Sequence, residues 1–332
     1  MSPSDVTTAT VEAAGTRIAS RIRRTPLDAS PSLTALCGVP VALKLETRQI
    51  TGSFKLRGAT NALLSLSPQA RAKGVVAAST GNHGRALAYA AAAEGIPAII
   101  CMSALVPGNK LAEIRRLGAE TRIVGQSQDD AQLEAERLSR EGYAMVAPFD
   151  DAAVVSGQGT IGHEILDDMA DVETVLVPLS GGGLAAGVAA AIKGRKPKTR
   201  VIGITMERGA AMAASLAAGH PVLVREERSL ADSLGGGIGL KNRITFPLCR
   251  DLLDEVILLS EGEIAAGMRH LYAVEREVCE GAGAVGVAAL LAWRVGRLAG
   301  PVAVIVSGRN VDMTLHRAVM NGVDDPFQEE GA

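Results

Sequence analysis

Runs of consecutive apolar residues, rich in Val and Ile, recur along this chain and alternate with Ala-rich segments of helical period. A continuous apolar run, unlike an alternating one, is typical of a strand buried on both faces, as in a parallel sheet covered by helices. We therefore predict an α/β fold in which strands and helices alternate. The predicted strands are 74–78, 97–102, 121–124, 174–178, 201–205, 256–259 and 302–306. The predicted helices are 82–94, 109–117, 129–141, 184–193 and 261–275.

The charge and composition of the chain exclude several classes of function. Lys and Arg total 34 against 36 for Asp and Glu, so there is no excess of basic residues of the kind that nucleic-acid binding requires. Aromatic residues make up only 2% of the chain, too few for the stacking platforms of single-strand binders. The most apolar stretch, 86–105, contains Glu94, Gly95 and Pro97, which interrupt any membrane span. We expect a small-molecule ligand, no nucleic-acid partner and no membrane association.

The cysteines are far apart in the sequence and include no C-x-x-C pair of the kind that zinc or redox sites use. This spacing is typical of buried free thiols in a reducing compartment, and it predicts a cytoplasmic protein. The four cysteines are Cys37, Cys101, Cys249 and Cys279.

Lys55 lies among apolar neighbours in the segment T-G-S-F-K-L-R-G at 51–58. An amine must lose its proton before it can form a Schiff base. Desolvation beside a second cation such as Arg57 would lower the pKa of Lys55 in the required direction. Taken alone, the segment does not distinguish a catalytic lysine from one at an ordinary helix start.

Two glycine-bearing segments each follow a predicted strand and precede a predicted helix. The first, S-T-G-N-H-G at 79–84, combines N–H groups at a helix start with polar side chains and suits a carboxylate, although a capped turn is the alternative. The second, S-G-G-G-L at 180–184, lets the backbone approach a phosphate closely, with a packing turn as the alternative. The second segment lacks a convincing dinucleotide-binding spacing.

Ser307 ends the predicted strand 302–306 and begins the segment S-G-R-N at 307–310. Ligands of open α/β sheets bind beyond the carboxyl ends of the strands. We therefore expect the turns after strands 74–78, 174–178 and 302–306 to converge on one ligand.

Taken in this order, the four segments resemble those of the serine/threonine dehydratase family of fold-type II pyridoxal-phosphate enzymes. The resemblance extends from R-T-P-L at 24–27 to Asp312. It implies a tryptophan synthase β-like α/β fold with two open, twisted, mostly parallel sheets flanked by helices. It also implies a small domain at 51–148 and a large cofactor-binding domain made of 1–50 and 149–332. Family members are commonly dimers, so we expect a homodimer.

The resemblance also implies a role for each site residue, with pyridoxal 5′-phosphate as the cofactor. Lys55 is the catalytic residue and holds the cofactor as a Schiff base. The other residues implied at the cofactor are Phe54 at the ring, Asn82 at its hydroxyl, Ser180, Gly181, Gly182, Gly183 and Leu184 at the phosphate, and Ser307 at the pyridine nitrogen. The residues implied at the substrate are Ser79, Thr80, Gly81, His83 and Glu280. For Glu280 a surface acid at a helix start is the alternative.

The activity that the resemblance implies is that of a lyase acting by β-elimination. The freed Lys55 amine removes the α-proton, the β-hydroxyl leaves as water, and the released enamine hydrolyses to ammonia and a 2-oxo acid. A serine hydroxyl does not hold the ring nitrogen protonated as a carboxylate would, so the carbanion should be short-lived and expel its β-leaving group promptly.

Departures from the usual family motifs bear on the substrate. Residues 229–240 contain serine and extra glycines where ordinary threonine dehydratases read A-D-G, and S-G-R-N replaces their S-G-G-N or S-G-A-N. Both variants resemble the hydroxyectoine-utilization dehydratases. We therefore expect a hydroxylated amino-acid-like substrate from hydroxyectoine degradation, with threonine/serine dehydratase and threo-3-hydroxyaspartate dehydratase as alternatives.

Other functions fit the sequence less well. Family racemases have a serine where this chain has Thr80, and β-replacement is a further alternative. A ligand-binding protein that had lost the chemistry would have no need of Lys55. Some members bind a cation through two acids, but here Glu207 is followed at 209–213 by no second carboxylate, so we expect no metal.

Overall fold

The computed structural model describes residues 2–79, 81–106 and 108–327. Its strands are β1 (Leu27–Ala29), β2 (Val41–Leu45), β3 (Val75–Ala78), β4 (Ala98–Met102), β5 (Glu120–Ile123), β6 (Ala144–Met145), β7 (Thr174–Pro178), β8 (Arg200–Met206), β9 (Glu255–Leu259) and β10 (Val302–Val306). Its α-helices are α1 (Thr8–Ile18), α2 (Pro31–Cys37), α3 (Lys55–Ser65), α4 (Pro68–Lys73), α5 (Asn82–Ala93), α6 (Gly108–Arg116), α7 (Gln128–Arg140), α8 (Ala152–Asp168), α9 (Gly183–Arg195), α10 (Ala211–Ala218), α11 (Thr245–Leu252), α12 (Glu261–Ala273), α13 (Gly281–Leu291) and α14 (Met313–Met320). Short 3-10 helices are η1 (Pro3–Asp5), η2 (Glu46–Arg48) and η3 (Asp232–Leu234).

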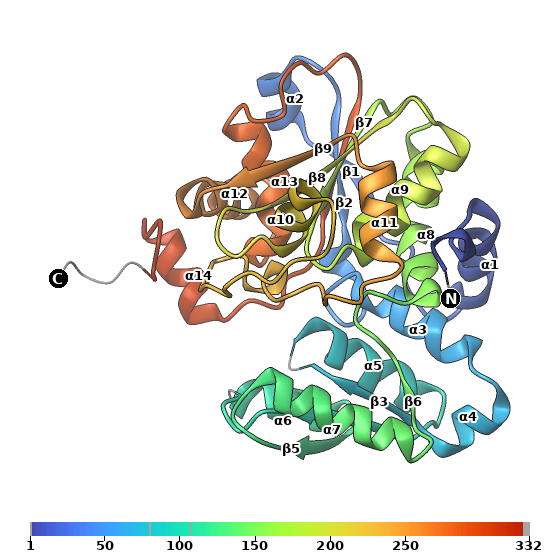
Figure 1. Ribbon diagram of the computed structural model, residues 1–332. Coiled ribbons are helices and arrows are strands. Elements are labelled where there is room, and N and C mark those ends of the chain that lie inside the picture. The colour runs from blue at the N-terminus through green and yellow to red at the C-terminus, as the bar shows by residue number, and fades with distance from the viewer. Residues whose placement is uncertain (1, 80, 107, 328–332) are drawn as a thin grey trace.

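The strands form two sheets, one in the upper and one in the lower part of Figure 1. The larger sheet has the order β1-β2-β10-β7-β8-β9, and the smaller has the order β5-β4-β3-β6. The pair β1–β2 is antiparallel, and the other pairs are parallel. The chain leaves the larger sheet after β2, builds the smaller sheet, and returns at β7. The predicted α/β fold with two mostly parallel sheets is confirmed.

Strand β10 shows why the apolar runs are continuous. Val302, Val304 and Val306 pack in a core with residues of α12 and α13, whereas Ala303 and Ile305 pack on the opposite face with residues of α8 and α9. All five residues of the strand are buried. A strand covered by helices on both faces needs apolar side chains at every position, so polar alternation is absent.

The predicted strands and helices are all present, with ends that differ by one or two residues. Strands β1, β2 and β6 were missed. Strand β2 contains the fully buried Lys44, whose charge interrupts the apolar pattern, and β1 and β6 span only 3 and 2 residues. The domain boundaries inferred from the resemblance stay a prediction. Within the described ranges, no helix combines the length and apolarity needed to cross a bilayer.

Candidate active site

Lys55 begins α3, where the chain passes from the larger sheet to the smaller one. Its Nζ donates a hydrogen bond of 2.8 Å to the carbonyl of Pro148 and lies 5.3 Å from the centroid of the Phe54 ring. Burial lowers the pKa of Lys55 to about 8, and the carboxylate of Glu280 opposes this effect. A larger share of the amine is therefore unprotonated near neutral pH than for an exposed lysine, as a nucleophile requires.

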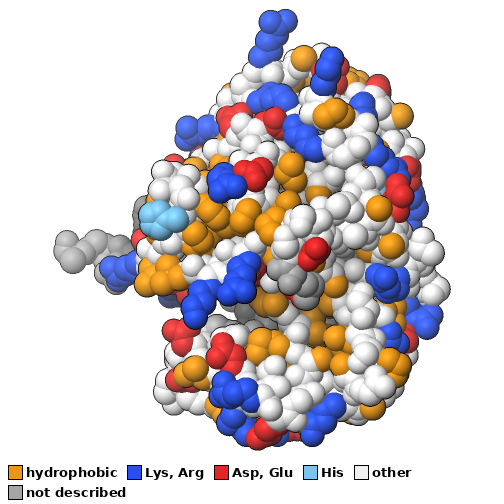
Figure 2. Space-filling model, turned by 45° about the vertical axis from the view of Figure 1, so that its right-hand side comes forward, with side chains coloured by type: hydrophobic (Ala, Val, Ile, Leu, Met, Phe, Trp, Pro, Cys, Tyr) orange, Lys and Arg blue, Asp and Glu red, His pale blue; other side chains and the backbone are white. Residues whose placement is uncertain are grey.

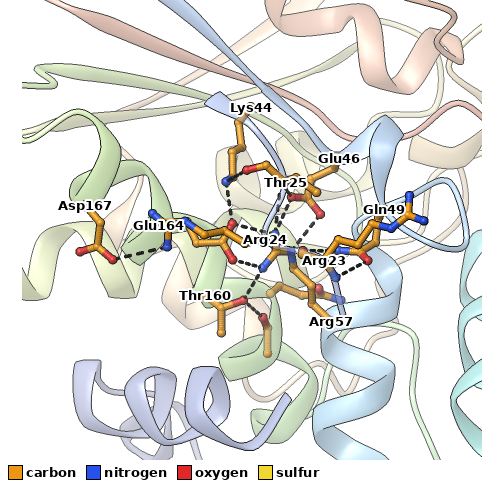
Figure 3. A network of polar contacts seen from close by, with 12 residues as sticks. Arg23, Arg24, Thr25, Lys44, Glu46, Gln49, Arg57, Thr160, Glu164 and Asp167 are labelled. Carbon is orange, nitrogen blue, oxygen red and sulfur yellow. Dashed lines mark hydrogen bonds and ion pairs between the residues drawn. The ribbon is translucent and has the colours of Figure 1, made fainter. Parts of the chain in front are cut away.

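Arg57 does not have the role that we expected from the sequence. Its fully buried guanidinium is paired with the carboxylates of Glu46 and Glu164 at 2.8 and 2.7 Å, as Figure 3 shows. Burial, rather than the compensated charge of Arg57, lowers the pKa of Lys55. The predicted direction of the shift is right, but the predicted contribution of Arg57 is wrong.

The turn after β10 lies against the residues that precede Lys55. The Phe54 N–H donates to the carbonyl of Ser307 at 3.0 Å, and Ser53 pairs with Gly308 in an isolated bridge. Among the described residues, the buried Ser307 hydroxyl has one long contact, 3.5 Å, with the Ala282 carbonyl. It can therefore turn toward a ligand at little cost in lost hydrogen bonding.

The glycine loop 181–183 joins β7 to α9 and packs against Phe149. Gly182 has a φ of +88°, which a residue with a side chain rarely adopts. A Cβ atom at Gly181 would come within 2.5 Å of the Phe149 ring. The first N–H groups of the 13-residue α9, which include that of the buried Leu184, have no acceptor within the helix and favour an anion.

Asn82 and Glu280 connect the turn after β3 to the start of α13. The Asn82 Nδ2 donates to the Glu280 Oε1 at 2.8 Å. Glu280 is only 3% exposed, which excludes the alternative of a surface acid. Asn310 donates through its Nδ2 to the Asn82 Oδ1 at 2.6 Å and to the Thr51 carbonyl at 2.9 Å. Sequence reasoning assigned no role to Asn310, although it ends the S-G-R-N segment.

His83 is buried, and its Nε2 donates to the Val146 carbonyl at 2.8 Å. Burial and the charge of Lys55 lower the pKa of His83 to about 3, so the ring is neutral. Because the Nε2 is occupied, a carboxylate bound at this turn would be held by N–H groups at the start of α5. The Gly81 N–H itself approaches the Ser79 Oγ at 3.4 Å. Thr80 lies outside the described residues.

The turns after β3, β7 and β10 thus meet between the two sheets, as expected. Lys55 contacts Pro148, the next residue Phe149 contacts the glycine loop, and Asn82 contacts Glu280. Figure 2 shows an indentation of the surface between the larger and smaller parts of the molecule, with basic side chains along its upper rim.

These residues fit pyridoxal phosphate. The hydroxyls of Thr51 and Ser53 are buried and have no hydrogen-bond partner among the described residues. Buried polar groups without partners are costly, so a polar ligand at this place would relieve that cost. Lys55, the 181–184 loop, Asn82 and Ser307 are the groups that would hold the cofactor.

Metal-dependent and cysteine-based chemistry find less support among the described residues. The described residues, Glu207 among them, contain no group of three or more His, Cys, Asp or Glu side chains that could bind a metal ion. The four cysteines are free, and burial raises the pKa of Cys249 to about 12, so this thiol is unreactive near neutral pH.

Comparison with known proteins gives consistent results. The family described as pyridoxal-phosphate dependent enzyme matches residues 18–308. A protein of Sinorhizobium fredii, provisionally named a threonine dehydratase, is 61% identical over 98% of this chain and 99% of its own length. The L-threonine ammonia-lyase of Thermotoga maritima is 42% identical over 90% of this chain and 74% of its own. The structure of maize serine racemase superposes with a TM-score of 0.90 at 32% identity, covering 96% of this chain and 97% of that one.

Proposed function

Because this chain belongs to the serine/threonine dehydratase branch of the pyridoxal-phosphate dependent enzyme family, we propose that Lys55 is its catalytic residue and that L-threonine and L-serine are its substrates. The protein is a pyridoxal-phosphate-dependent lyase. The observation that carries the proposal is the half-buried Lys55, with the pKa of its amine lowered to about 8, beside the turns after β7 and β10. The reaction would release ammonia and a 2-oxo acid.

Different groups would carry out different steps of the elimination. When bound, pyridoxal phosphate supplies an electron sink that stabilises negative charge at the substrate Cα. The Lys55 Nζ would take the Cα proton, since its lowered pKa permits it to act as a base near neutral pH. The proton could then pass to the departing β-hydroxyl, which leaves as water.

Glu280 and Asn82 would position the substrate and the cofactor ring. Their 2.8 Å hydrogen bond joins the turn after β3 to α13, so each fixes the orientation of the other. N–H groups at the start of α5 would bind the substrate carboxylate, because a helix N-terminus favours a negative charge. The glycine loop and the start of α9 would bind the cofactor phosphate in the same way.

Hydroxyectoine-derived compounds and threo-3-hydroxyaspartate are the competing substrates. The Asn310 side chain contacts Asn82 directly, but the S-G-R-N, S-G-G-N and S-G-A-N segments all end in this asparagine, so it does not distinguish the substrates. The names of the relatives described above favour threonine over the hydroxyectoine-derived substrate.

Incubation with each candidate substrate tests the proposal. We expect ammonia and the matching 2-oxo acid from L-threonine and L-serine, and little from threo-3-hydroxyaspartate or hydroxyectoine derivatives. A Lys55→Ala variant should lose the yellow cofactor on gel filtration and should release no ammonia. If none of these compounds releases ammonia and L-serine is converted to D-serine, the protein is a racemase and not a lyase.

We also propose a homodimer, which rests on the family resemblance, and a cytoplasmic location, which rests on the cysteine pattern. The four free cysteines are compatible with a reducing compartment. Sedimentation equilibrium should give twice the chain mass of 34.2 kDa.

A further inference from the structure

We propose that Arg57 is a positioning residue, which holds the first turn of α3 against α8 and thereby fixes the place of the Lys55 amine. The inference rests on the proposed function of Lys55. Arg57 lies two residues after Lys55, and its side chain points into a buried polar cluster (Figure 3). The buried cluster consists of Thr25, Lys44, Glu46, Arg57, Thr160 and Glu164.

The guanidinium of Arg57 is held by two bidentate contacts. Its Nε and Nη2 donate to the two carboxylate oxygens of Glu46 at 2.9 and 2.8 Å. Its Nη1 and Nη2 donate to the two oxygens of Glu164 at 2.7 and 2.9 Å, and Nη1 also donates to the Thr160 Oγ1 at 3.1 Å. These bonds use all five N–H groups of the side chain, so its position is fixed from two directions.

The cluster acts through geometry rather than through a net charge near Lys55. Lys44 completes it with a 2.6 Å contact between its Nζ and the Glu164 Oε2. Two cations and two carboxylates therefore compensate one another. Burial by itself would lower the pKa of Arg57, but Glu46 and Glu164 raise it, so the guanidinium remains charged. The titratable groups that affect or respond to Lys55 are instead Glu280 and His83.

The Arg57 contacts hold the first turn of α3 in addition to the hydrogen bond from the Phe54 N–H to the Ser307 carbonyl. The residue before Lys55, Phe54, provides no side-chain cap for the helix. The acceptor of the Lys55 hydrogen bond is the carbonyl of Pro148, four residues before the start of α8 at Ala152. The ion pair between Arg57 on α3 and Glu164 on α8 therefore joins the two chain segments that carry the Lys55 donor and its acceptor.

The test uses Arg57→Lys, which keeps the positive charge but cannot bind two carboxylates bidentately. Apoprotein is mixed with pyridoxal phosphate between pH 6 and 10, trapped with borohydride, and the modified Lys55 peptide is measured by mass. In the parent the trapping rate should have its midpoint near pH 8. In Arg57→Lys a loosened first turn admits water to the amine. The midpoint should then rise toward the ordinary lysine value of about 10.4, and the rate at neutral pH should fall roughly tenfold per pH unit of that rise.

Two further variants separate positioning from stability. Glu164→Gln weakens the α8 side of the contact and should shift the midpoint in the same direction, by less. If Arg57→Lys does not fold, Glu164→Gln tests the positioning role of Arg57 in its place. Lys44→Met is the matched control, because it removes a charge from the same cluster without touching α3. This control should lower the melting temperature and leave the midpoint near that of the parent.

The outcomes are distinguishable from a failure of the proposed function. If trapping in the parent does not label Lys55, the role of Lys55 itself is wrong. If Lys55 is labelled but Arg57→Lys and Glu164→Gln change only the melting temperature, as Lys44→Met does, the positioning role of Arg57 is wrong. A raised midpoint in Arg57→Lys and Glu164→Gln, with none in Lys44→Met, supports the inference.

Discussion

At the scale of single residues, the charge of Lys55 affects the protonation of His83. The positive charge of Lys55 adds to burial in lowering the pKa of His83 to about 3. The His83 Nε2–H donates to Val146, and its Nδ1 is buried without a hydrogen-bond partner among the described residues. The neutral ring therefore serves as a fixed donor to the Val146 carbonyl, and it does not act as an acid or base near neutral pH.

This burial predicts a sensitivity to acid. In the unfolded chain His83 takes up a proton near pH 6.5, whereas in the folded protein it does so only near pH 3. The unfolded state therefore binds more protons between these values, and stability falls as the pH is lowered through them. Between pH 7 and pH 5 the free energy of unfolding of the apoprotein should fall by about 2 kcal/mol from this group alone.

Urea unfolding of the parent and of His83→Gln at both pH values measures that contribution. Glutamine keeps an amide donor for the Val146 carbonyl but does not titrate. The parent should lose about 2 kcal/mol more than the variant on acidification. Equal losses would show that the pKa of His83 is the same in the folded and the unfolded protein.

Residue roles could be predicted from the sequence only where a role belongs to a short continuous motif. Lys55, Asn82, Ser307 and the glycine loop were found in this way, and their roles in catalysis and binding stay predictions. Pro148, Phe149 and Asn310 were not found, because each reaches the site through a contact with a residue far away in the sequence. A short sequence motif does not show a contact between residues that are far apart in the sequence.

At the scale of elements, the packing of α3 on α8 determines the place of the Lys55 amine. The two helices approach closely where Gly58 faces Gly157, and the Gly58 N–H donates to the Gln158 side chain at 3.2 Å. Helix α8 was missed from the sequence because its glycines, which weaken helix propensity, are explained only by this approach and by its packing on α9. Helix α5, by contrast, follows a glycine turn and is rich in alanine, so it was predicted.

A methyl group at Gly157 should separate these helices. A Cβ atom there would lie 2.7 Å from the Gly58 Cα and 2.8 Å from the Arg57 carbonyl, and backbone atoms cannot turn aside as a side chain can. We expect Gly157→Ala to cost about 1–3 kcal/mol of stability and to lower kcat with L-threonine. Thermal unfolding and ammonia release measure the two effects.

Gly262→Ala is the matched control for that substitution. Gly262 lies in the first turn of α12, and a Cβ atom added there has no neighbour within 4 Å. Alanine should therefore leave the activity unchanged and raise stability by up to about 1 kcal/mol through helix propensity. A loss of stability in Gly262→Ala as large as that in Gly157→Ala would show that the close approach is not the cause.

At the scale of the whole molecule, the candidate site draws on both sheets. Asn82 follows a strand of the smaller sheet, whereas the glycine loop and Ser307 follow strands of the larger one. Sequence reasoning predicted the parallel strands and the convergence of their ends, since both follow from continuous apolar runs. The resemblance implied a small domain at 51–148, but the apolar runs alone could not show that the chain builds the smaller sheet between β2 and β7, because the pairing partners of a strand do not show in its own sequence.

Binding of pyridoxal phosphate should therefore stabilise the molecule as a unit. A ligand present at about 100 times its dissociation constant adds about 2.7 kcal/mol to the free energy of unfolding. We expect the melting temperature of the parent to rise by several degrees on addition of the cofactor. Lys55→Ala should show a smaller rise, because the phosphate loop remains.

Pyridoxal without its phosphate is the control for the cofactor experiment. It can still react with the Lys55 amine but offers nothing to the glycine loop, so its effect on the parent should be smaller. An identical rise with pyridoxal and pyridoxal phosphate would show that the loop at 181–184 does not bind the phosphate.

The central place of β10 has a consequence for biosynthesis. Strand β10 pairs with both β2 and β7, yet it follows every other described strand in the chain. While the polypeptide grows on the ribosome, β1-β2 and β7-β8-β9 remain two separate pieces with open edges, and open strand edges are prone to aggregation. Ser307, which the resemblance places at the pyridine nitrogen, has also not yet been synthesised. A message with a premature stop codon before Val302 would therefore yield a chain that can neither close its larger sheet nor complete its cofactor site, and cellular proteases should remove it.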